Sequence, residues 1–199
     1  FDLLDELLSE PKNVFGSKDH NIVFDGNKYA KEIGVTPEEA DARFKAIERY
    51  TGDAYSEIRE SQRNGTDSED ALAIERYLKT AKKYDGRIYR GIQLKTVDKF
   101  HEMFGTEGAE FRESSLNSWS SDIQIANDFA HHDESRPVSV IFGVNNKTGS
   151  SIRNLSEEFE EEEVLTPKNA RYKIVKATIK NDKSGGQLIT VRLEQLNDE

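Results

Sequence analysis

The sequence predicts an α+β fold in which N-terminal helices precede a mixed or antiparallel β core. Two observations lead to this prediction: apolar residues recur at helical spacing over the first 85 residues, and short β-favouring segments follow from Gly86 onward. A third observation excludes a doubly wound nucleotide-binding fold. The strands do not alternate with long crossover helices, and no glycine-rich phosphate turn follows the first strand.

The composition fits one globular domain with a core, or a core plus a small helical appendage. The chain has 199 residues, 35% of them hydrophobic and 33% charged, and its seven Tyr and ten Phe argue against disorder. A net charge of -10 and a pI near 5.0 disfavour nucleic acid and anionic membranes as partners, and favour a protein or a small molecule. The absence of cysteine excludes disulfides, a thiol nucleophile and a Cys-ligated zinc site.

The ends of the sequence carry little targeting information. No apolar run approaches the roughly 20 residues that span a bilayer, and no signal-peptide pattern begins at Phe1. Because the first residue is not Met, we expect the chain to be a fragment or a processed product of a larger parent polypeptide.

We assign residues 1–35 to an N-terminal helical extension and residues 36–199 to a single main domain. In the extension, Asp2–Leu8 forms a short amphipathic helix whose leucine face must dock on the domain or on a neighbour. A polar connection through Pro11 and Gly16 follows it.

The helical part of the main domain spans residues 36–85. Thr36 is expected to cap a helix that begins at Pro37, and the glutamates that follow suit the positive end of its dipole. Asn64-Gly65 then separates two further helical stretches, at about 53–63 and 68–83.

The β-rich part spans residues 86–199. Short helices are expected at Val97–Phe104 and Asp122–Ala130. The β-favouring segments that we expect to form strands are Arg87–Ile92, Glu113–Trp119, Pro137–Val144, Glu163–Leu165, Tyr172–Ile179 and Gln187–Leu196.

Arg90 is the first candidate site residue, since it lies on a predicted strand and Gly91 behind it permits a close approach. An arginine there forks two hydrogen bonds onto a phosphate or a carboxylate. The alternative is an ordinary structural salt bridge.

Ser118 and Ser120 form the second candidate feature. Residues two apart on a strand point to the same face, so the two hydroxyls share one side while Trp119 packs on the other. Ser121 or Asp122 also suits the N-cap of the helix that follows.

The third feature is the acidic run that ends at Glu161-Glu162-Glu163, directly before the apolar Val164-Leu165. Glu161 and Glu163 lie two apart at a strand entry and are expected to point to one side. Two carboxylates in one pocket perform acid/base chemistry or stabilise a cation. The alternative is a solvated acidic loop.

In this order, the three features resemble the mono-ADP-ribosyltransferases of the Arg-Ser-Glu class, which include clostridial actin-modifying toxins, the cholera-toxin group and phage-encoded transferases. The resemblance includes Ala126 and Phe129 after the serines, and Tyr50-Thr51-Gly52 through Tyr55 and Ile58 upstream. It covers about residues 40–193. This sequence departs from the family at Trp119 and Ser121, and at Arg59, where the toxins often carry Asn.

The resemblance implies a two-sheet β core of the ADP-ribosyltransferase type and NAD as the substrate, without a metal. Glu163 would hold the 2′-hydroxyl of the nicotinamide ribose and offset the charge of an oxocarbenium-like transition state. Ser118 would fix Glu163, Arg90 would bind the pyrophosphate side, and Phe129 would stack on nicotinamide. The full set of NAD-binding residues expected is Arg90, Gly91, Ser118, Ser120, Phe129, Tyr55 and His132.

The resemblance also implies an arginine acceptor, because members with Glu at the position of Glu161 modify arginine. Glu161 would orient the guanidinium and accept its proton, and Phe159 would contact the target protein. The expected partners are therefore NAD, a protein with an accessible arginine, and a larger parent polypeptide or delivery partner. By analogy the chain would be secreted or injected into a host or target cell.

Other functions remain open. An NAD glycohydrolase would use the same pocket with water as acceptor, and a non-catalytic NAD-binding or protein-interaction module would keep the fold. A metal hydrolase built on His131, His132 and Asp133 is disfavoured because adjacent histidines point apart and no HExxH spacing occurs. A two-carboxylate glycosidase would normally take its acids from separate elements.

Overall fold

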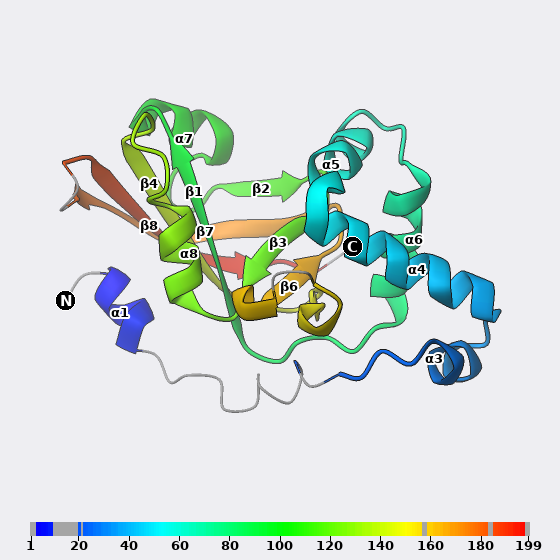
Figure 1. Ribbon diagram of the computed structural model, residues 1–199. Coiled ribbons are helices and arrows are strands. Elements are labelled where there is room, and N and C mark those ends of the chain that lie inside the picture. The colour runs from blue at the N-terminus through cyan, green and yellow to red at the C-terminus, as the bar shows by residue number, and fades with distance from the viewer. Residues whose placement is uncertain (1–2, 10–19, 21, 157–158, 183–184, 198–199) are drawn as a thin grey trace.

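The computed structural model describes residues 3–9, 20, 22–156, 159–182 and 185–197. Most of the helices gather at one end of a mixed sheet, while three short helices pack near its other end (Figure 1). The helices are α1 (Leu3–Ser9), α3 (Gly26–Ile33), α4 (Pro37–Arg49), α5 (Tyr55–Arg63), α6 (Glu69–Thr80), α7 (Val97–Phe104) and α8 (Ile123–Phe129), with a π-helical turn η1 (Tyr50–Ala54) and 3-10 turns η2 (Arg153–Leu155) and η3 (Phe159–Glu161).

Helix α4 begins where the sequence predicts. The Thr36 hydroxyl accepts a hydrogen bond from the Glu39 amide at 3.1 Å, and Pro37 occupies the first turn. Ala40 and Ile47 are fully buried, and Phe44 packs against the aromatic rings of Phe24, Tyr29 and Tyr77.

Helix α3 lies in the N-terminal extension, in a stretch where the sequence predicts no separate helix. The Asp25 carboxylate caps its first turn and Gly34, at φ +79°, ends it. These two caps are the local signals that could have predicted the helix.

The sheet contains eight strands in the order β2-β7-β8-β4-β1-β3-β6-β5. Among the strands that the structure describes, only β4 and β8 pair in parallel; the other neighbours are antiparallel. The strands are β1 (Arg87–Leu94), β2 (Glu110–Glu113), β3 (Asn117–Ser120), β4 (Val138–Asn145), β5 (Ser150–Ser151), β6 (Glu163–Thr166), β7 (Ala170–Asn181) and β8 (Gln187–Gln195).

The β core differs from expectation in the division of one strand, in the connection of the sheets, and in the short strand β5, which the sequence does not predict. The predicted strand 113–119 is two strands, because the chain turns at 114–116 and sends β2 to pair with β7 and β3 to pair with β6. The two expected sheets form one continuous sheet, because a single residue pair, Tyr89 with Ser120, connects β1 to β3.

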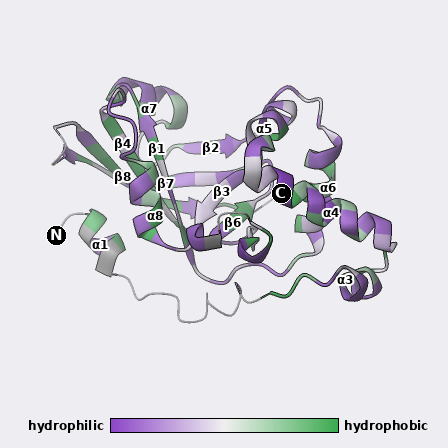
Figure 2. Ribbon diagram, viewed as in Figure 1, coloured by the Kyte–Doolittle hydropathy of each residue, from purple (hydrophilic) through white to green (hydrophobic). Residues whose placement is uncertain are grey.

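The core has a sheet part and a helical part. The sheet part includes Phe100, Phe142, Trp119 and Tyr172, and hydrophobic residues are conspicuous in β4 and β8 (Figure 2). The helical part places α4 and α6 on Leu116 and Leu165. Burial of these side chains stabilises each part by roughly 25 cal/mol per Å² of apolar surface.

The N-terminal helix α1 docks on the domain rather than projecting from it. Leu3 and Leu7 are buried, and Leu7 packs with Tyr89 and Ala126. A Cβ on Gly143 would lie 3.1 Å from the Leu7 side chain, so the glycine leaves room for this leucine. Leu4 and Leu7 of the predicted leucine face therefore meet the sheet and the region of α8, while the Leu8 side chain lies outside the described residues.

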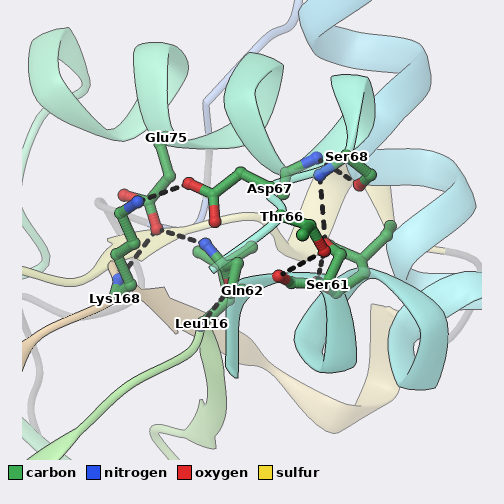
Figure 3. Close-up of polar contacts among 10 residues, drawn as sticks. Ser61, Gln62, Thr66, Asp67, Ser68, Glu75, Leu116 and Lys168 are labelled. Carbon is green, nitrogen blue, oxygen red and sulfur yellow. Dashed lines mark hydrogen bonds and ion pairs between the residues drawn. The ribbon is translucent and has the colours of Figure 1, made fainter. Parts of the chain in front are cut away.

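A polar network joins the helical part to the sheet near the start of β3 (Figure 3). Gln62 donates to Glu75 at 2.9 Å and accepts from the Leu116 amide at 2.7 Å. Glu75 also accepts from the Lys168 amide at 2.8 Å, while the Lys168 ammonium pairs with Asp67. The network thereby fixes three segments that are far apart in the sequence next to the strand that carries Ser118.

No helix in the described part of the chain is both long and apolar enough to cross a membrane.

Candidate active site

A pocket of about 410 Å³ lies where the helical part meets the joint between β1 and β3. Nine of the ten residues predicted for the site line it: Tyr55, Arg90, Gly91, Ser118, Ser120, Phe129, His132, Glu161 and Glu163. The side chain of the tenth, Phe159, lies outside the described residues. Side chains from α5, β1, β3, α8, η3 and β6 are thus brought together although they span more than a hundred positions of sequence.

Arg90 lines the pocket. It also forms a structural salt bridge, the alternative role that the sequence suggests for it. Its Nη1 lies 3.2 Å from Glu113 Oε1, and its side chain is 18% exposed. Burial lowers the pKa of Arg90 and the nearby Arg59 acts in the same direction, while Glu113 raises it. The guanidinium nevertheless stays charged, because an arginine side chain is not deprotonated in proteins, so the pocket wall is cationic here.

Gly91 is required by the packing of α8. A Cβ at Gly91 would lie 1.8 Å from the Ala126 carbonyl oxygen, which is backbone and cannot move aside alone. Helix α8 therefore lies directly on β1 and carries the half-exposed Phe129 to the pocket. The glycine permits a close approach, as predicted, and the group that approaches it is a helix of the same chain.

Tyr50, which was not among the predicted site residues, reaches into the pocket from η1. Gly52 departs from helical geometry (φ −90°, ψ −122°) within this turn between α4 and α5, and such turns are frequent at functional sites. The Tyr50 hydroxyl lies 3.1 Å from Ser118 Oγ. The available signal is Tyr50-Thr51-Gly52, which resembles the family only as part of its helical region and does not by itself predict a pocket residue.

Glu163 is the first residue of β6, where it pairs with Ser120 of β3, and it is 6% exposed. Burial raises its pKa to about 7; the Glu161 charge adds to the rise, and a hydrogen bond with Ser118 and the Arg59 charge oppose it. A carboxyl group that titrates near neutrality in a pocket is a candidate functional group.

Glu161 and Glu163 reach the same pocket, although strand alternation is not the reason. Glu161 ends η3, and Glu162 has φ +48°, a left-handed conformation that is uncommon for a residue with a side chain. This turn sends the Glu162 carboxylate to Ser121, whose hydroxyl donates to it at 3.0 Å. The neighbours on either side then line the pocket.

The two serines of the predicted face have different partners. Ser118 bonds with Tyr50 and Glu163. Ser120 donates to the Glu161 carbonyl oxygen at 2.6 Å and accepts from the Asp122 amide at 3.0 Å. Asp122 in turn caps α8 by accepting from the Gln124 amide, so the predicted helix cap at this position is confirmed.

Arg59 is a second pocket residue that was not predicted to bind NAD. It donates to Asn117 Oδ1 at 2.6 Å, while its buried Nε has no hydrogen-bond partner within the described structure. Arg59 and Arg90 together give this part of the pocket two guanidinium groups, and the Glu113 carboxylate pairs with Arg90.

The adjacent histidines bond in different directions. His131 Nε2 lies 2.7 Å from Asp182, whereas His132 Nδ1 lies 2.8 Å from the Phe129 carbonyl oxygen. Over the part of the chain that the structure describes, no group of three or more acidic, His or Cys side chains is placed to hold a metal ion.

Comparison with known proteins identifies the family of the chain. Residues 35–197 match the family model described as NAD:arginine ADP-ribosyltransferase. Mav of Mycobacterium avium strain 104, which carries the name NAD(+)–arginine ADP-ribosyltransferase, is 26% identical over 193 residues, covering 94% of this chain. The chain spans only 22% of the length of that relative.

Solved structures of bacterial ADP-ribosyltransferases share the fold. Vis of Vibrio splendidus superposes with a TM-score of 0.67 at 21% identity, over 98% of this chain and 91% of Vis. Plx2a of Paenibacillus larvae gives 0.64 at 20% identity, over 92% and 94% of the two chains. From the match of the family model over most of its length, the chain belongs to the NAD:arginine ADP-ribosyltransferase family.

Proposed function

We propose that this chain transfers ADP-ribose from NAD to an arginine side chain of a target protein and releases nicotinamide. The observation that carries the proposal is the meeting of Arg90, Ser118, Glu161 and Glu163 in one pocket. The family to which the chain belongs is described by that activity. Among its structural relatives, Vis has been solved with agmatine, a guanidinium compound.

In the first half of the proposed reaction, the bond between nicotinamide and ribose C1′ breaks and its electron pair leaves with nicotinamide. Positive charge grows on C1′, and the buried Glu163 carboxylate offsets it in the transition state. Ser118 holds this carboxylate, and the Tyr50 hydroxyl holds Ser118. Arg90 and Arg59 would bind the pyrophosphate, since guanidinium groups fork onto phosphate oxygens.

Aromatic side chains at the pocket rim complete the proposed NAD site. Phe129 and Tyr55 are each about half exposed there and would pack on the nicotinamide side. His132 lines the same pocket and would contact the phosphates.

In the second half, a guanidinium nitrogen of the acceptor attacks C1′ and gives up a proton. Glu161 lines the same cavity and would orient the cationic guanidinium and accept that proton. Phe159, in the adjoining turn η3, would contact the target protein. An acidic rim suits a basic target surface.

We further propose that the chain acts in a cell other than the one that makes it, delivered with a parent polypeptide or partner. Plx2a is named a toxin and XopAI of Xanthomonas axonopodis a type III effector, and both share this fold.

The proposal is tested by incubating the purified chain with labelled NAD, with and without agmatine, poly-arginine or a cell lysate. Nicotinamide release and label on the acceptor are followed together. Hydroxylamine-sensitive label on protein is the expected result. Nicotinamide release without label on any acceptor would replace the transferase by an NAD glycohydrolase, and neither signal from folded protein would favour a binding module.

A further inference from the structure

His20, in the N-terminal extension, is bonded to the loop that carries the acidic motif. It is buried, with 4% exposure, and its Nδ1 lies 2.5 Å from Ser151 Oγ while its Nε2 lies 2.9 Å from Ser121 Oγ. The Asn154 side-chain amide donates to the carbonyl oxygens of His20 and Ile22 at 2.7 Å each. None of these residues lines the pocket.

The bonds form a directed chain that ends on the middle glutamate of the motif. The Ser121 hydroxyl donates to the Glu162 carboxylate at 3.0 Å, because an ionised carboxylate only accepts. Ser121 Oγ therefore accepts from the Nε2–H of His20. With Nε2 protonated, the Nδ1 of a neutral ring accepts from the Ser151 hydroxyl.

Glu162 needs such support because its backbone is left-handed, at φ +48°. A residue with a side chain in this region costs on the order of 1 kcal/mol or more unless its surroundings hold it there. Ser121 holds it twice, through the carboxylate and through its own amide, which donates to the Glu162 carbonyl oxygen at 3.2 Å.

The two glutamates on either side depend on this turn unequally. Glu163 belongs to β6 and is fixed by its pairing with Ser120 and by the bond from the Ile152 amide to its carbonyl oxygen. Glu161 precedes the turn and lies outside the sheet, which holds it only through the bond from the Ser120 hydroxyl to its backbone carbonyl oxygen within the described contacts. A change in the backbone of Glu162 therefore redirects Glu161 while β6 keeps Glu163 in place.

We propose that His20 is a positioning residue for the acceptor side of the site: through Ser121 it holds Glu162 in its left-handed turn, and so directs Glu161 into the pocket. The consequence for catalysis rests on the proposed function, in which Glu161 orients the acceptor guanidinium. The N-terminal extension then helps the site to select an arginine side chain over water as the acceptor of ADP-ribose.

Two substitutions of His20 separate this role from simple filling of space. In His20→Gln the side-chain amide reaches toward the place of Nε2 and keeps a donor for Ser121. In His20→Asn the shorter amide replaces Nδ1 and keeps only the Ser151 contact. His20→Ala and Ser121→Ala remove the chain altogether, and Val191→Ala, in the sheet core away from the pocket, controls for a general loss of stability.

The first measurement is hydrogen exchange of the free protein, in peptides that contain Glu161–Glu163. Faster exchange is expected in His20→Asn, His20→Ala and Ser121→Ala, and near wild-type exchange in His20→Gln. Equal exchange in the Asn and Gln variants would overturn the proposal, and this measurement needs no enzymatic activity.

The second measurement is the ratio of agmatine modification to NAD hydrolysis. In His20→Asn and Ser121→Ala the ratio is expected to fall roughly tenfold to a hundredfold through a higher KM for agmatine, the scale of a misplaced reacting group. NAD hydrolysis should stay within about twofold, because β6 still places Glu163. A parallel fall of both activities, as in Val191→Ala, would show a merely structural role. If the wild-type chain does not cleave NAD, the proposed function is refuted instead. The hydrogen-exchange measurement by itself would then decide the role of His20.

Discussion

The phenol oxygen of Tyr50 lies 3.1 Å from Ser118 Oγ. Tyr50 belongs to the turn between two helices, whereas Ser118 lies on a strand and also forms a hydrogen bond with Glu163. Burial raises the pKa of Tyr50, which keeps the phenol protonated as a donor. When Glu163 is ionised it accepts from Ser118, and Ser118 is then free to accept from Tyr50. The helical part and the sheet are thereby coupled at the proposed reacting centre.

Tyr50→Phe tests this coupling, because it removes the hydroxyl and leaves the ring in the core. The kcat for nicotinamide release is expected to fall about tenfold, with a stability loss of about 1 kcal/mol, the usual contribution of one hydrogen bond. Steady-state kinetics and thermal unfolding measure the two effects. Tyr77→Phe, which removes a buried phenol from the helical core away from the pocket, should leave kcat unchanged; an equal loss in both variants would refute the coupling.

Glu163→Gln should abolish NAD cleavage and change how stability depends on pH. The pKa of Glu163 is raised from an ordinary value of 4.5 to about 7, so the folded protein binds this proton more tightly than the unfolded chain. The resulting stability is fully present below pH 4.5 and is lost as the pH rises toward and through 7. Above pH 7 the Gln variant should therefore be more stable than wild type, by up to about 3 kcal/mol.

The same ionisation predicts the pH profile of activity. Nicotinamide release by the wild type should rise between pH 6 and 8 as Glu163 loses its proton, since the carboxylate stabilises the cationic centre. Denaturant unfolding and initial rates across pH 5 to 9 measure both effects. A wild-type rate that is flat over this range would contradict the assignment of Glu163.

Glu161→Gln should separate transfer from hydrolysis. Loss of the carboxylate that orients the guanidinium and takes its proton is expected to lower agmatine modification by about 10² or more. NAD hydrolysis should persist, because Glu163 is untouched. The exposed neighbour provides a matched control, and Glu160→Gln should retain both activities. Full transfer by Glu161→Gln would exclude Glu161 as the acceptor-side base.

Gly91→Ala should displace α8. The added Cβ would lie 1.8 Å from the Ala126 carbonyl oxygen, and relief requires the helix to leave β1 and take Phe129 with it. We expect a raised KM for NAD and a stability loss of at least about 2 kcal/mol, within the range for overpacking. Gly26→Ala is the control, since its Cβ would meet nothing within 4 Å. Unchanged NAD binding in Gly91→Ala would contradict the packing role.

Gln62→Ala should weaken the network of Figure 3. It removes the acceptor that lies 2.7 Å from the Leu116 amide, and it removes a donor to Glu75. Burial already raises the pKa of Glu75. The expected loss is about 2 kcal/mol, typical of a buried group left without a partner. Urea unfolding measures it, with the exposed Gln124→Ala as control. A loss below about 0.5 kcal/mol would mean that water replaces these bonds.

The sequence by itself determined the elements whose signals are local. Thr36-Pro37 predicted the start of α4, and most strand positions followed from β-favouring segments bounded by polar turns. The ordered motifs, through their resemblance to a known family, also identified nine of the residues that line the pocket, but not Tyr50 or Arg59.

The tertiary structure decided how those residues are held. Nothing local indicates that His20 bonds Ser121 and Ser151 across more than a hundred positions, or that Tyr50 bonds Ser118. The left-handed turn at Glu162 places its neighbours in the pocket, where alternation along a strand had been expected. Contacts of this kind have no sequence period, because they arise only when separate elements pack and their buried polar groups must find partners.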